Sequence, residues 1–393
     1  MKAMKWKFHS LAFVAGMSIL TACSSDDNND NDGNGGNGNG NEIENGTILK
    51  GTVTSDVTLA AGNTYKLSGE YIVEEGATLH IEEGVKIIAV YDDIADYILV
   101  KQGGKINAIG TPDKPIVMTS EKEEPGAWGG IHICGRAHTN AEGGKGSSEI
   151  GGAVYGGNDD ADNSGTLQYI RLEYTGFAFD EEHEANGISF YGVGNGTIVD
   201  HCQAYKGSDD GFEFFGGSVN VSNLVAVSCS DDSFDWTEGW NGKGTNLVAY
   251  QEAESTLGYD CDCLMECDNN GSNNAATPVA HPVLKNLILV GNGGSKQGIR
   301  LRAGTEVEID NAKVCGKGQP LTVETALTEN ALKNGTSKLT NITLTSELSS
   351  KEGIYTHADF IAVTSNKVDA NLSYSSFEDI RKECSWMNGS WVK

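Results

Sequence analysis

The chain has 393 residues, of which 55 are acidic and 28 basic, so its formal net charge is −27. A surface of this charge repels phosphate backbones, which excludes nucleic acid as a partner, and it makes anionic lipid headgroups poor partners. Glycine accounts for 51 residues and proline for only 6. This composition indicates a chain that turns often, and it excludes collagen-like and proline-rich linker architectures.

The first 22 residues have the features of a cleaved export signal. A basic stretch, MKAMKWK, precedes an apolar run from Leu11 to Leu20, which is too short to span a bilayer. Leu20-Thr21-Ala22-Cys23 resembles a bacterial lipobox, whose cysteine receives a diacylglycerol. We therefore expect a lipoprotein signal peptide over 1–22 and a covalent lipid on Cys23 that anchors the protein to the outer membrane. An ordinary secretory signal with a chance cysteine is the alternative.

The segment that follows is predicted to be a tether. Residues 24–42 contain no apolar side chain and therefore cannot bury surface to offset chain entropy. We expect the lipidated cysteine and a disordered acidic and Gly/Asn-rich linker over 23–46. The run Ser24-Ser-Asp-Asp27 resembles the export signal of Bacteroidota-type surface lipoproteins, which implies that the protein faces the exterior. A solvated spacer with the folded body in the periplasm is the alternative.

From residue 47 onward, short β-rich runs alternate with Gly, Asn and Asp turns. Asn223-Leu-Val-Ala-Val and Asn246-Leu-Val-Ala-Tyr lie 23 residues apart, and Ser208-Asp-Asp-Gly-Phe-Glu-Phe matches Ser230-Asp-Asp-Ser-Phe-Asp-Trp at an offset of 22. This period fits a coil of three short strands and three turns. The sequence therefore predicts an all-β fold, a right-handed parallel β-helix with short helical or irregular caps.

We expect the parallel β-helix over 47–316, and the last coils with a C-terminal cap over 317–393. Open ends of a β-helix need covering, and three segments are predicted to cap them: Gly46–Gly69, the helical candidate Pro320–Asn334 and the weaker helical candidate Ser375–Trp386. Because strand side chains alternate, we expect one stacked core row containing Cys202, Leu224, Leu247 and Leu287. His201 aligns with Asn223 and Asn246, which favours a structural role in a turn.

Several motifs occur in collinear order: Gly103-Gly-Lys-Ile, Trp128-Gly-Gly-Ile, Tyr155-Gly-Gly-Asn-Asp-Asp and Asp209-Asp-Gly-Phe-Glu-Phe-Phe-Gly-Gly. In these landmarks the chain resembles the right-handed parallel β-helix surface lipoproteins of the Bacteroidota, which have a pectin-lyase-like fold, from about residue 47 to 305. The resemblance implies the fold and a place at the cell surface. It implies little about activity, because members of that family are mostly uncharacterised.

The offset of 22 also stacks acidic residues. It pairs Asp209 with Asp231, Asp210 with Asp232, and Glu213 with Asp235. Equivalent positions in neighbouring coils lie about 4.8 Å apart, where two unit charges repel by roughly 3 kcal/mol at an effective dielectric constant of about 20. Our hypothesis is that Ca²⁺ neutralises the stack. The alternatives are raised carboxylate pKa values, basic side chains, or turn aspartates that point into water.

Further acidic residues are candidates for the same chemistry. Asp262, Glu266 and Asp268 are candidates to continue the row in the next coil. The loop Asn158-Asp-Asp-Ala-Asp-Asn-Ser-Gly165 has the crowding of a calcium loop but lacks the EF-hand spacing. It is open to interpretation as a second metal loop or as a polar turn.

Aromatic and basic residues supply candidates for ligand binding. Phe212 with Phe234, and Phe214 with Trp236, are expected to stack in the core. Trp240 lies between Gly239 and Gly242 and is a candidate sugar-stacking platform. Arg300 and Arg302 project from one face of a strand, where guanidinium groups recognise carboxylates or offset the acidic surface of the protein itself.

We expect a surface-exposed, non-catalytic binding or accessory module whose partner is a polysaccharide or an outer-membrane protein. One alternative is a calcium-dependent lyase or hydrolase of acidic glycans, for which Arg300, Arg302 and Asp210 are the catalytic candidates. Against it, the chain lacks the Arg-x-Pro-x-x-Arg, Gly-His-Gly and Arg-Ile-Lys patterns, and fold-level analogy is a weak warrant. A structural or adhesin-like surface protein is the third reading.

Eight cysteines follow Cys23, an even number that permits disulfides in an exported chain. The pattern Cys261-x-Cys-x-x-x-Cys267 lacks the spacing of a zinc site. We expect one local bridge among Cys229, Cys261, Cys263 and Cys267, with the remaining cysteines as buried thiols.

Overall fold

The computed structural model describes residues 41–92, 94–179 and 183–393. The predicted signal peptide, the predicted lipidation site at Cys23 and residues 23–40 of the predicted tether lie outside these residues. Residues 41–46 correct the predicted boundary of the tether, because the strand Asn41–Ile43 already belongs to the folded body. No helix in the described ranges has the length and apolar character needed to cross a membrane.

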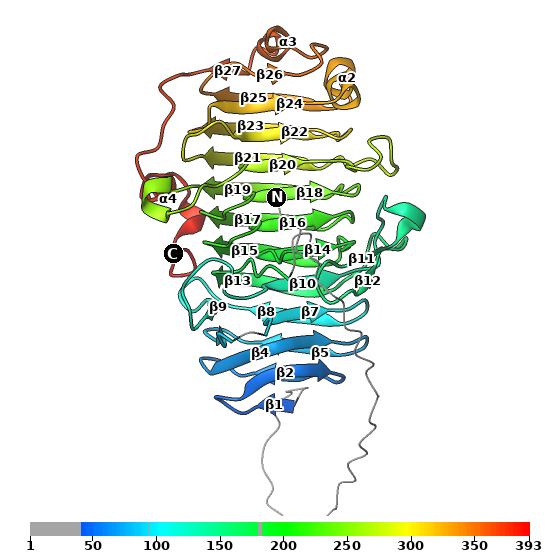
Figure 1. Cartoon of the computed structure of the whole chain (residues 1–393), viewed down its shortest axis with the longest axis vertical. Coiled ribbons are helices and arrows are strands. Elements are labelled where there is room, and N and C mark those ends of the chain that lie inside the picture. The colour runs from blue at the N-terminus through cyan, green and yellow to red at the C-terminus, as the bar shows by residue number, and fades with distance from the viewer. Residues whose placement is uncertain (1–40, 93, 180–182) are drawn as a thin grey trace, which may run out of the picture. The chain divides into compact units, whose positions relative to one another are not determined.

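The described residues form the predicted right-handed parallel β-helix (Figure 1). A first ladder of parallel strands runs through its length. It consists of β1 (Asn41–Ile43), β3 (Val57–Leu59), β5 (Thr78–Ile81), β8 (Lys105–Ile109), β13 (Gly165–Glu173), β15 (Ile198–Tyr205), β17 (Asn220–Val227), β19 (Lys243–Tyr250), β21 (Val283–Val290), β23 (Glu308–Cys315), β25 (Lys338–Leu344) and β27 (Lys367–Val368).

A second parallel ladder carries the acidic residues. It consists of β2 (Ile48–Val53), β4 (Thr64–Val73), β7 (Tyr97–Val100), β10 (Ile131–Cys134), β14 (Ile188–Tyr191), β16 (Phe212–Phe215), β18 (Phe234–Thr237), β20 (Met265–Cys267), β22 (Gln297–Leu301), β24 (Gln319–Val323) and β26 (Ser349–Ser350).

The third side of each coil is separate only in the early coils, where β6 (Lys86–Ala89) and β9 (Ile116–Ser120) pair between β4 and the end of β13. An excursion between β10 and β13 contains the 3₁₀ helix η1 (Glu142–Gly144) and the antiparallel pair β11 (Gly146–Ser147) and β12 (Val154–Tyr155).

From β13 onward one long strand covers two sides of the coil and bends at a left-handed residue. This position is held by Tyr169, His201, Asn223, Asn246, Asn286, Asn311 and Asn341, with φ between 52° and 64°. Asn246 Nδ2 donates to Asn223 Oδ1 at 2.8 Å, and Asn286 Nδ2 donates to Asn246 Oδ1 at 3.0 Å. His201 occupies the same position and stacks on Tyr169 at 4.4 Å, which confirms its structural role in the bend.

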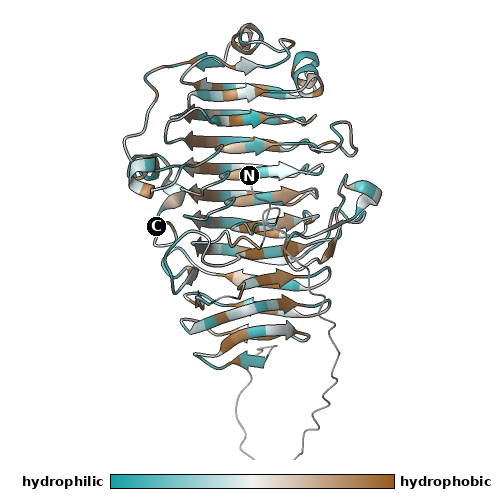
Figure 2. Ribbon diagram, in the orientation of Figure 1, coloured by the Kyte–Doolittle hydropathy of each residue, from teal (hydrophilic) through white to brown (hydrophobic). Residues whose placement is uncertain are grey.

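The register confirms the period and the core. Leu224 pairs with Cys202 in one neighbouring coil and with Leu247 in the other. Phe212 pairs with Phe234, and their rings stack 5.6 Å apart. Cys202 is fully buried, so it serves packing. Figure 2 shows the resulting apolar bands repeating from strand to strand.

The ends of the molecule differ from the expected caps. Residues 46–69 belong to β2, β3 and β4, because Tyr65 and Leu67 continue the core row and are fully buried. Pro320–Val323 is part of strand β24, and only Ala326–Asn334 is helical, as α2. Helix α2 and α3 (His357–Ala362) lie beyond the last long strands (Figure 1).

The predicted C-terminal helix forms, but it does not cap an end. Helices α4 (Phe377–Glu383) and η2 (Ser385–Met387) lie against the side of the stack (Figure 1). There, fully buried Trp391 and Ile380 share one apolar cluster with Val225 and Val248. These valines point away from the inner core, so the C-terminal segment is needed to cover them.

Candidate functional site

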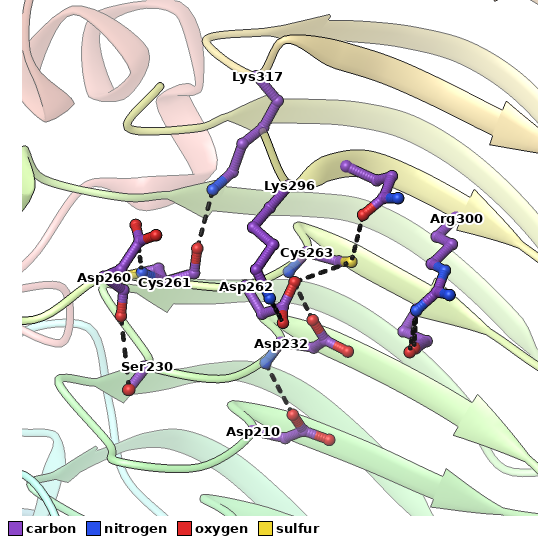
Figure 3. Close-up of polar contacts among 12 residues, drawn as sticks. Asp210, Ser230, Asp232, Asp260, Cys261, Asp262, Cys263, Lys296, Arg300 and Lys317 are labelled. Carbon is purple, nitrogen blue, oxygen red and sulfur yellow. Dashed lines mark hydrogen bonds and ion pairs between the residues drawn. The ribbon is translucent and has the colours of Figure 1, made fainter. Parts of the chain in front are cut away.

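A column of side chains in the turns before the second-ladder strands ties successive coils together. Asp210 donates its backbone N–H to Asn186 Oδ1 at 3.2 Å, and Asp232 donates its own to Asp210 Oδ1 at 2.8 Å. Cys263 continues the column by donating its backbone N–H to Asp232 Oδ1 at 2.6 Å (Figure 3). Asp210 and Asp232 are 6% and 5% exposed, so each carboxylate is fixed by a backbone donor from the next coil.

A second acidic column lies on the outward face of the strands themselves. Glu213 pairs with Asp235, Asp235 with Glu266, and Glu266 with Arg300. The two columns are adjacent, and Asp209, Asp231 and Asp268 lie one or two residues away from their members in the sequence. We call the acidic residues of both columns and these three neighbours together the carboxylate ladder, which consists of Asp209, Asp210, Glu213, Asp231, Asp232, Asp235, Glu266 and Asp268.

The predicted metal-ligating residues are brought together. The carboxylate oxygens of Asp209, Asp210 and Asp231 lie within 4.8 Å of one another, and so do those of Asp210, Glu213 and Asp235. Asp210 belongs to both groups. Asp232 falls in a third group, with Asp262 and Cys263.

Basic partners lie at one end of the ladder. Arg302 contacts Asp268 at 2.7 Å and Glu266 at 3.2 Å, and Arg300 contacts Glu266 at 3.3 Å. Arg300 also contacts Glu324 at 3.3 Å. Both arginines therefore offset carboxylates of the protein, one of the two roles that the sequence left open.

The other end of the ladder lacks this compensation. No lysine or arginine in the described part of the chain forms an ion pair with Asp209, Asp210, Glu213, Asp231 or Asp235; the nearby Lys296 pairs with Asp262 instead. Asn186 Nδ2 donates to Glu213 Oε2 at 2.6 Å, which is a neutral partner.

Burial and mutual repulsion change the acid–base properties of this end. Burial, and then the charge of Asp231, raise the pKa of Asp209 to about 7. Burial first and neighbouring carboxylates second hold the pKa of Asp210, Glu213, Asp232 and Asp235 well above the ordinary range.

The site has the donors that a hard divalent cation requires. The ligand atoms of the first two groups are all carboxylate oxygens, which Ca²⁺ prefers, and Asp235 Oδ1 is a buried oxygen without a hydrogen-bond partner. A cavity of about 270 Å³ beside the ladder is lined by Asp231, Asp260 and Asp262 together with Ser230 and Lys296. The exposed residue Asp231 therefore connects the ladder to solvent.

The comparison with family models adds a finding that agrees with this architecture. A model described as a pectate-lyase-like β-helix domain matches residues 51–392, which include the whole carboxylate ladder. The chain belongs to the pectate-lyase-like β-helix domain family. Neither the curated proteins nor the solved structures that were compared give a match.

Within this pectate-lyase-like domain, Trp240 corrects one prediction. It is 1% exposed, its ring stacks on Phe214 at 4.2 Å, and its Nε1 donates to Val219 O at 3.1 Å. A sugar cannot reach either face of this ring. The flanking glycines indicated a loose segment, but the ring closes the core there.

The cysteines correct a second prediction. All eight cysteines between Cys134 and Cys384 are buried free thiols, so the expected bridge among Cys229, Cys261, Cys263 and Cys267 does not form. Cys229 and Cys267 are fully buried in the apolar core, where they pack as small apolar side chains.

The second acidic loop has the character of a polar turn. Asp160 Oδ1 lies 2.6 Å from His138 Nδ1, and Asp159 Oδ1 accepts the backbone N–H of Ala161 at 3.2 Å. None of the candidate metal groups among the described residues includes this loop.

Two residues of the site were not among those predicted from the sequence. Asn186 begins the column of turn side chains, and Glu149 is a half-buried carboxyl whose pKa is raised to about 7 by desolvation. Glu149 also raises the pKa of Glu213 through its charge. Glu149 lies in the excursion after β10, outside the repeat, so no periodic signal places it. Asn186 occupies the position of Asp210 in the preceding coil, because Ile188 pairs with Phe212, but the offset there is 24 residues and the side chain is an amide, so a search for stacked acids at an offset of 22 does not find it.

Proposed function

We propose that the protein is a lipid-anchored, outward-facing outer-membrane lipoprotein that acts as a non-catalytic glycan-binding module, and that its carboxylate ladder holds Ca²⁺. The family supports a surface or carbohydrate-related role. The export signal and the lipobox at Cys23 support the anchor, and stable anchoring follows from several acyl chains on one residue. An outer-membrane protein remains the alternative partner.

One observation carries the proposed cation site. Asp209, Asp210 and Asp231 bring their oxygens within 4.8 Å of one another at the end of the ladder that lacks arginine. Repulsion among these carboxylates disfavours their joint ionisation, and a bound divalent cation removes that cost. Asp209 and Asp231 would be the main ligands, because one oxygen of Asp210 already accepts the N–H of Asp232.

The non-catalytic assignment rests on the arginines. A lyase needs a group that abstracts a proton, and Arg300 and Arg302 are the candidates. Burial alone would lower their pKa values, but hydrogen bonds and ion pairs with Glu324, Asp268 and Glu266 raise both above the ordinary range. A guanidinium held in this state is a poor base.

A hydrolase of acidic glycans is the second candidate, because the pKa of Asp209 is raised to about 7 beside Asp231. Glycoside hydrolysis uses one protonated and one ionised carboxyl that flank the scissile bond, about 5–5.5 Å apart in retaining enzymes and about 6.5–9.5 Å apart in inverting ones. Incubation with uronic-acid polymers, followed by assays of reducing ends and unsaturated products, tests this candidate. Activity lost in Asp209→Asn, Asp210→Asn or Arg300→Ala would replace the non-catalytic proposal.

Calorimetric titration of the full chain with CaCl₂ tests the cation site. We expect saturable binding that the double variant Asp209→Asn/Asp231→Asn weakens at least about tenfold, because it removes two charged ligands but keeps side-chain shape. The matched control is Asp113→Asn, an exposed aspartate remote from the ladder, which should bind as the wild type does. Equal binding by the double variant and the control would contradict the proposal.

A further inference from the structure

A second cavity, of about 660 Å³, lies where strand β18 ends. Three segments far apart in the chain meet there: the excursion after β10, the end of β18 and the loop after β20. The lining side chains that carry polar groups include Asn140, Glu142, Thr237, Glu238, Asn270 and Asn273. The volume lies in the range of small-ligand sites, and none of the described lining residues is basic or aromatic.

Glu238 is held in a defined orientation at this cavity. Its Oε2 accepts the hydroxyl hydrogens of Thr139 at 2.7 Å and Tyr155 at 2.8 Å, and both donors are buried. Its Oε1 forms no hydrogen bond in the described structure. The carboxylate therefore has one oxygen fixed by the protein and one free to accept hydrogen bonds from a ligand.

At the edge of the second ladder, residues with left-handed backbone conformation occupy equivalent positions in several coils. Among them, a carboxylate is present at Glu238 alone in the described coils. Register places Gly192, Gly216 and Glu238 at equivalent positions, with φ of 56°, 66° and 53°. The equivalent position in the next coil is Asn269, which is not left-handed, and Ala303 and Thr325 resume the column in the following coils with φ of 48° and 68°. A glycine takes this conformation without strain, so Glu238 is not required by the backbone.

The opposite wall is fixed by amides. Asn140 is 8% exposed, and its Nδ2 donates to Asn269 Oδ1 at 2.8 Å while its Oδ1 accepts Asn270 Nδ2 at 3.0 Å. Its backbone N–H donates to Glu238 O at 3.0 Å. The cavity wall is therefore ordered by its own hydrogen bonds before any ligand binds, which lowers the entropic cost of binding.

We propose that this cavity binds a neutral carbohydrate, with adjacent hydroxyl groups donating to the carboxylates of Glu238 and Glu142. The inference rests on the proposed glycan-binding function and names its ligand class. Carboxylates and amides match the donors and acceptors of sugar hydroxyls. Glu142 is exposed, has no partner in the described structure and faces no basic residue in the lining, so a uronate carboxylate would meet only like charge.

Native affinity electrophoresis of the full chain tests the inference, with neutral polymers (dextran, xylan, mannan, galactan) and acidic ones (polygalacturonate, alginate) cast in the gel. EDTA is present, so the result does not depend on the proposed Ca²⁺ site. We expect at least one neutral polymer to retard the protein.

Glu142→Gln and Glu238→Gln should each weaken this retardation at least about tenfold. In Glu238→Gln the new amide keeps an oxygen for Thr139 and Tyr155 but turns a donor toward the cavity. Glu254→Gln, an exposed substitution elsewhere, is the matched control.

Retardation by a neutral polymer that is lost in the exposed variant Glu142→Gln supports the inference even if Glu238→Gln fails to fold. Absence of retardation by every neutral polymer, retardation by acidic polymers alone, or unchanged retardation in both variants overturns it. Because calcium titration is measured separately, binding of Ca²⁺ without neutral glycan would overturn this inference and leave the cation site standing.

Discussion

Asp235 illustrates how single residues set the chemistry of the ladder. Its Oδ1 is buried without a partner, and it lies in register between Glu213 and Glu266. A lone carboxylate in that position would be costly, so either a proton or a cation must compensate it. The raised pKa of Asp235 represents the first of these outcomes, and a cation held by the group of Asp210, Glu213 and Asp235 would represent the second.

Arg302 provides the same compensation from a side chain. Replacing it by Gln leaves Asp268, which is 6% exposed, without its cation, and leaves Glu266, which is 9% exposed, with Arg300 alone. We expect Arg302→Gln to lower the free energy of unfolding at pH 7 by about 2 kcal/mol, less than for a fully buried pair because Arg302 is partly exposed. Urea unfolding of the full chain measures this. An unchanged midpoint would show that the pair contributes nothing to stability.

The carboxyl of Asp96, which lies outside the carboxylate ladder, should make the stability of the protein depend on pH. Burial raises its pKa to about 7, so the folded state binds this proton more tightly than the unfolded state does. The stabilisation is complete below about pH 4 and is lost as the pH rises through about 7.

In Asp96→Asn this dependence should disappear, because an amide does not titrate. The free energy of unfolding, measured with urea at pH 4.5 and at pH 8, should change between these two pH values by on the order of 3 kcal/mol less in the variant than in the wild type. Asp113→Asn serves as the control. The same pH dependence in the Asp96 variant and the wild type would contradict the assignment of the raised pKa to Asp96.

At the scale of the element, the bends of the long strands are stabilised by a chain of asparagine amides. Asn246 contributes twice, as donor to Asn223 and as acceptor from Asn286, and its φ of 59° is also unfavourable for most side chains. Two causes of stability are therefore combined in one residue, and two substitutions separate them.

We expect Asn246→Gly to lower the free energy of unfolding by about 1–2 kcal/mol, because it removes the two hydrogen bonds. Asn246→Ala should lower the free energy of unfolding by about 1 kcal/mol more, because alanine is strained in the left-handed conformation. Thermal or urea unfolding of both variants measures the difference. Equal stability of the two variants would mean that the bend is not strained for alanine.

The elements show what sequence can predict. The 22-residue offset repeats in the letters themselves, so the register of Asp209 with Asp231 and of Phe212 with Phe234 followed directly. The burial of Trp240 could not be predicted in this way, because its neighbouring glycines do not indicate that its ring stacks on Phe214. The cavity at Glu238 depends on Asn140 and Asn270, which come from separate excursions about 130 residues apart, and no repeat predicts their meeting.

At the scale of the whole chain, the net charge of −27 is unevenly compensated. Arginines neutralise one end of the ladder, and the proposed cation would neutralise the other. The neutral glycan proposed for the second cavity fits the same charge balance, since an acidic chain disfavours acidic polymers unless a cation bridges them.

The most direct test of the central claim is the position of a bound cation. Crystals of the protein soaked in MnCl₂, which supplies an anomalous scatterer for oxygen-ligand sites, should show an anomalous difference peak in contact with the carboxylate oxygens of Asp209 and Asp231. Calcium added in excess should displace it. A crystal with ordered carboxylates at these residues and no peak beside them would contradict the account.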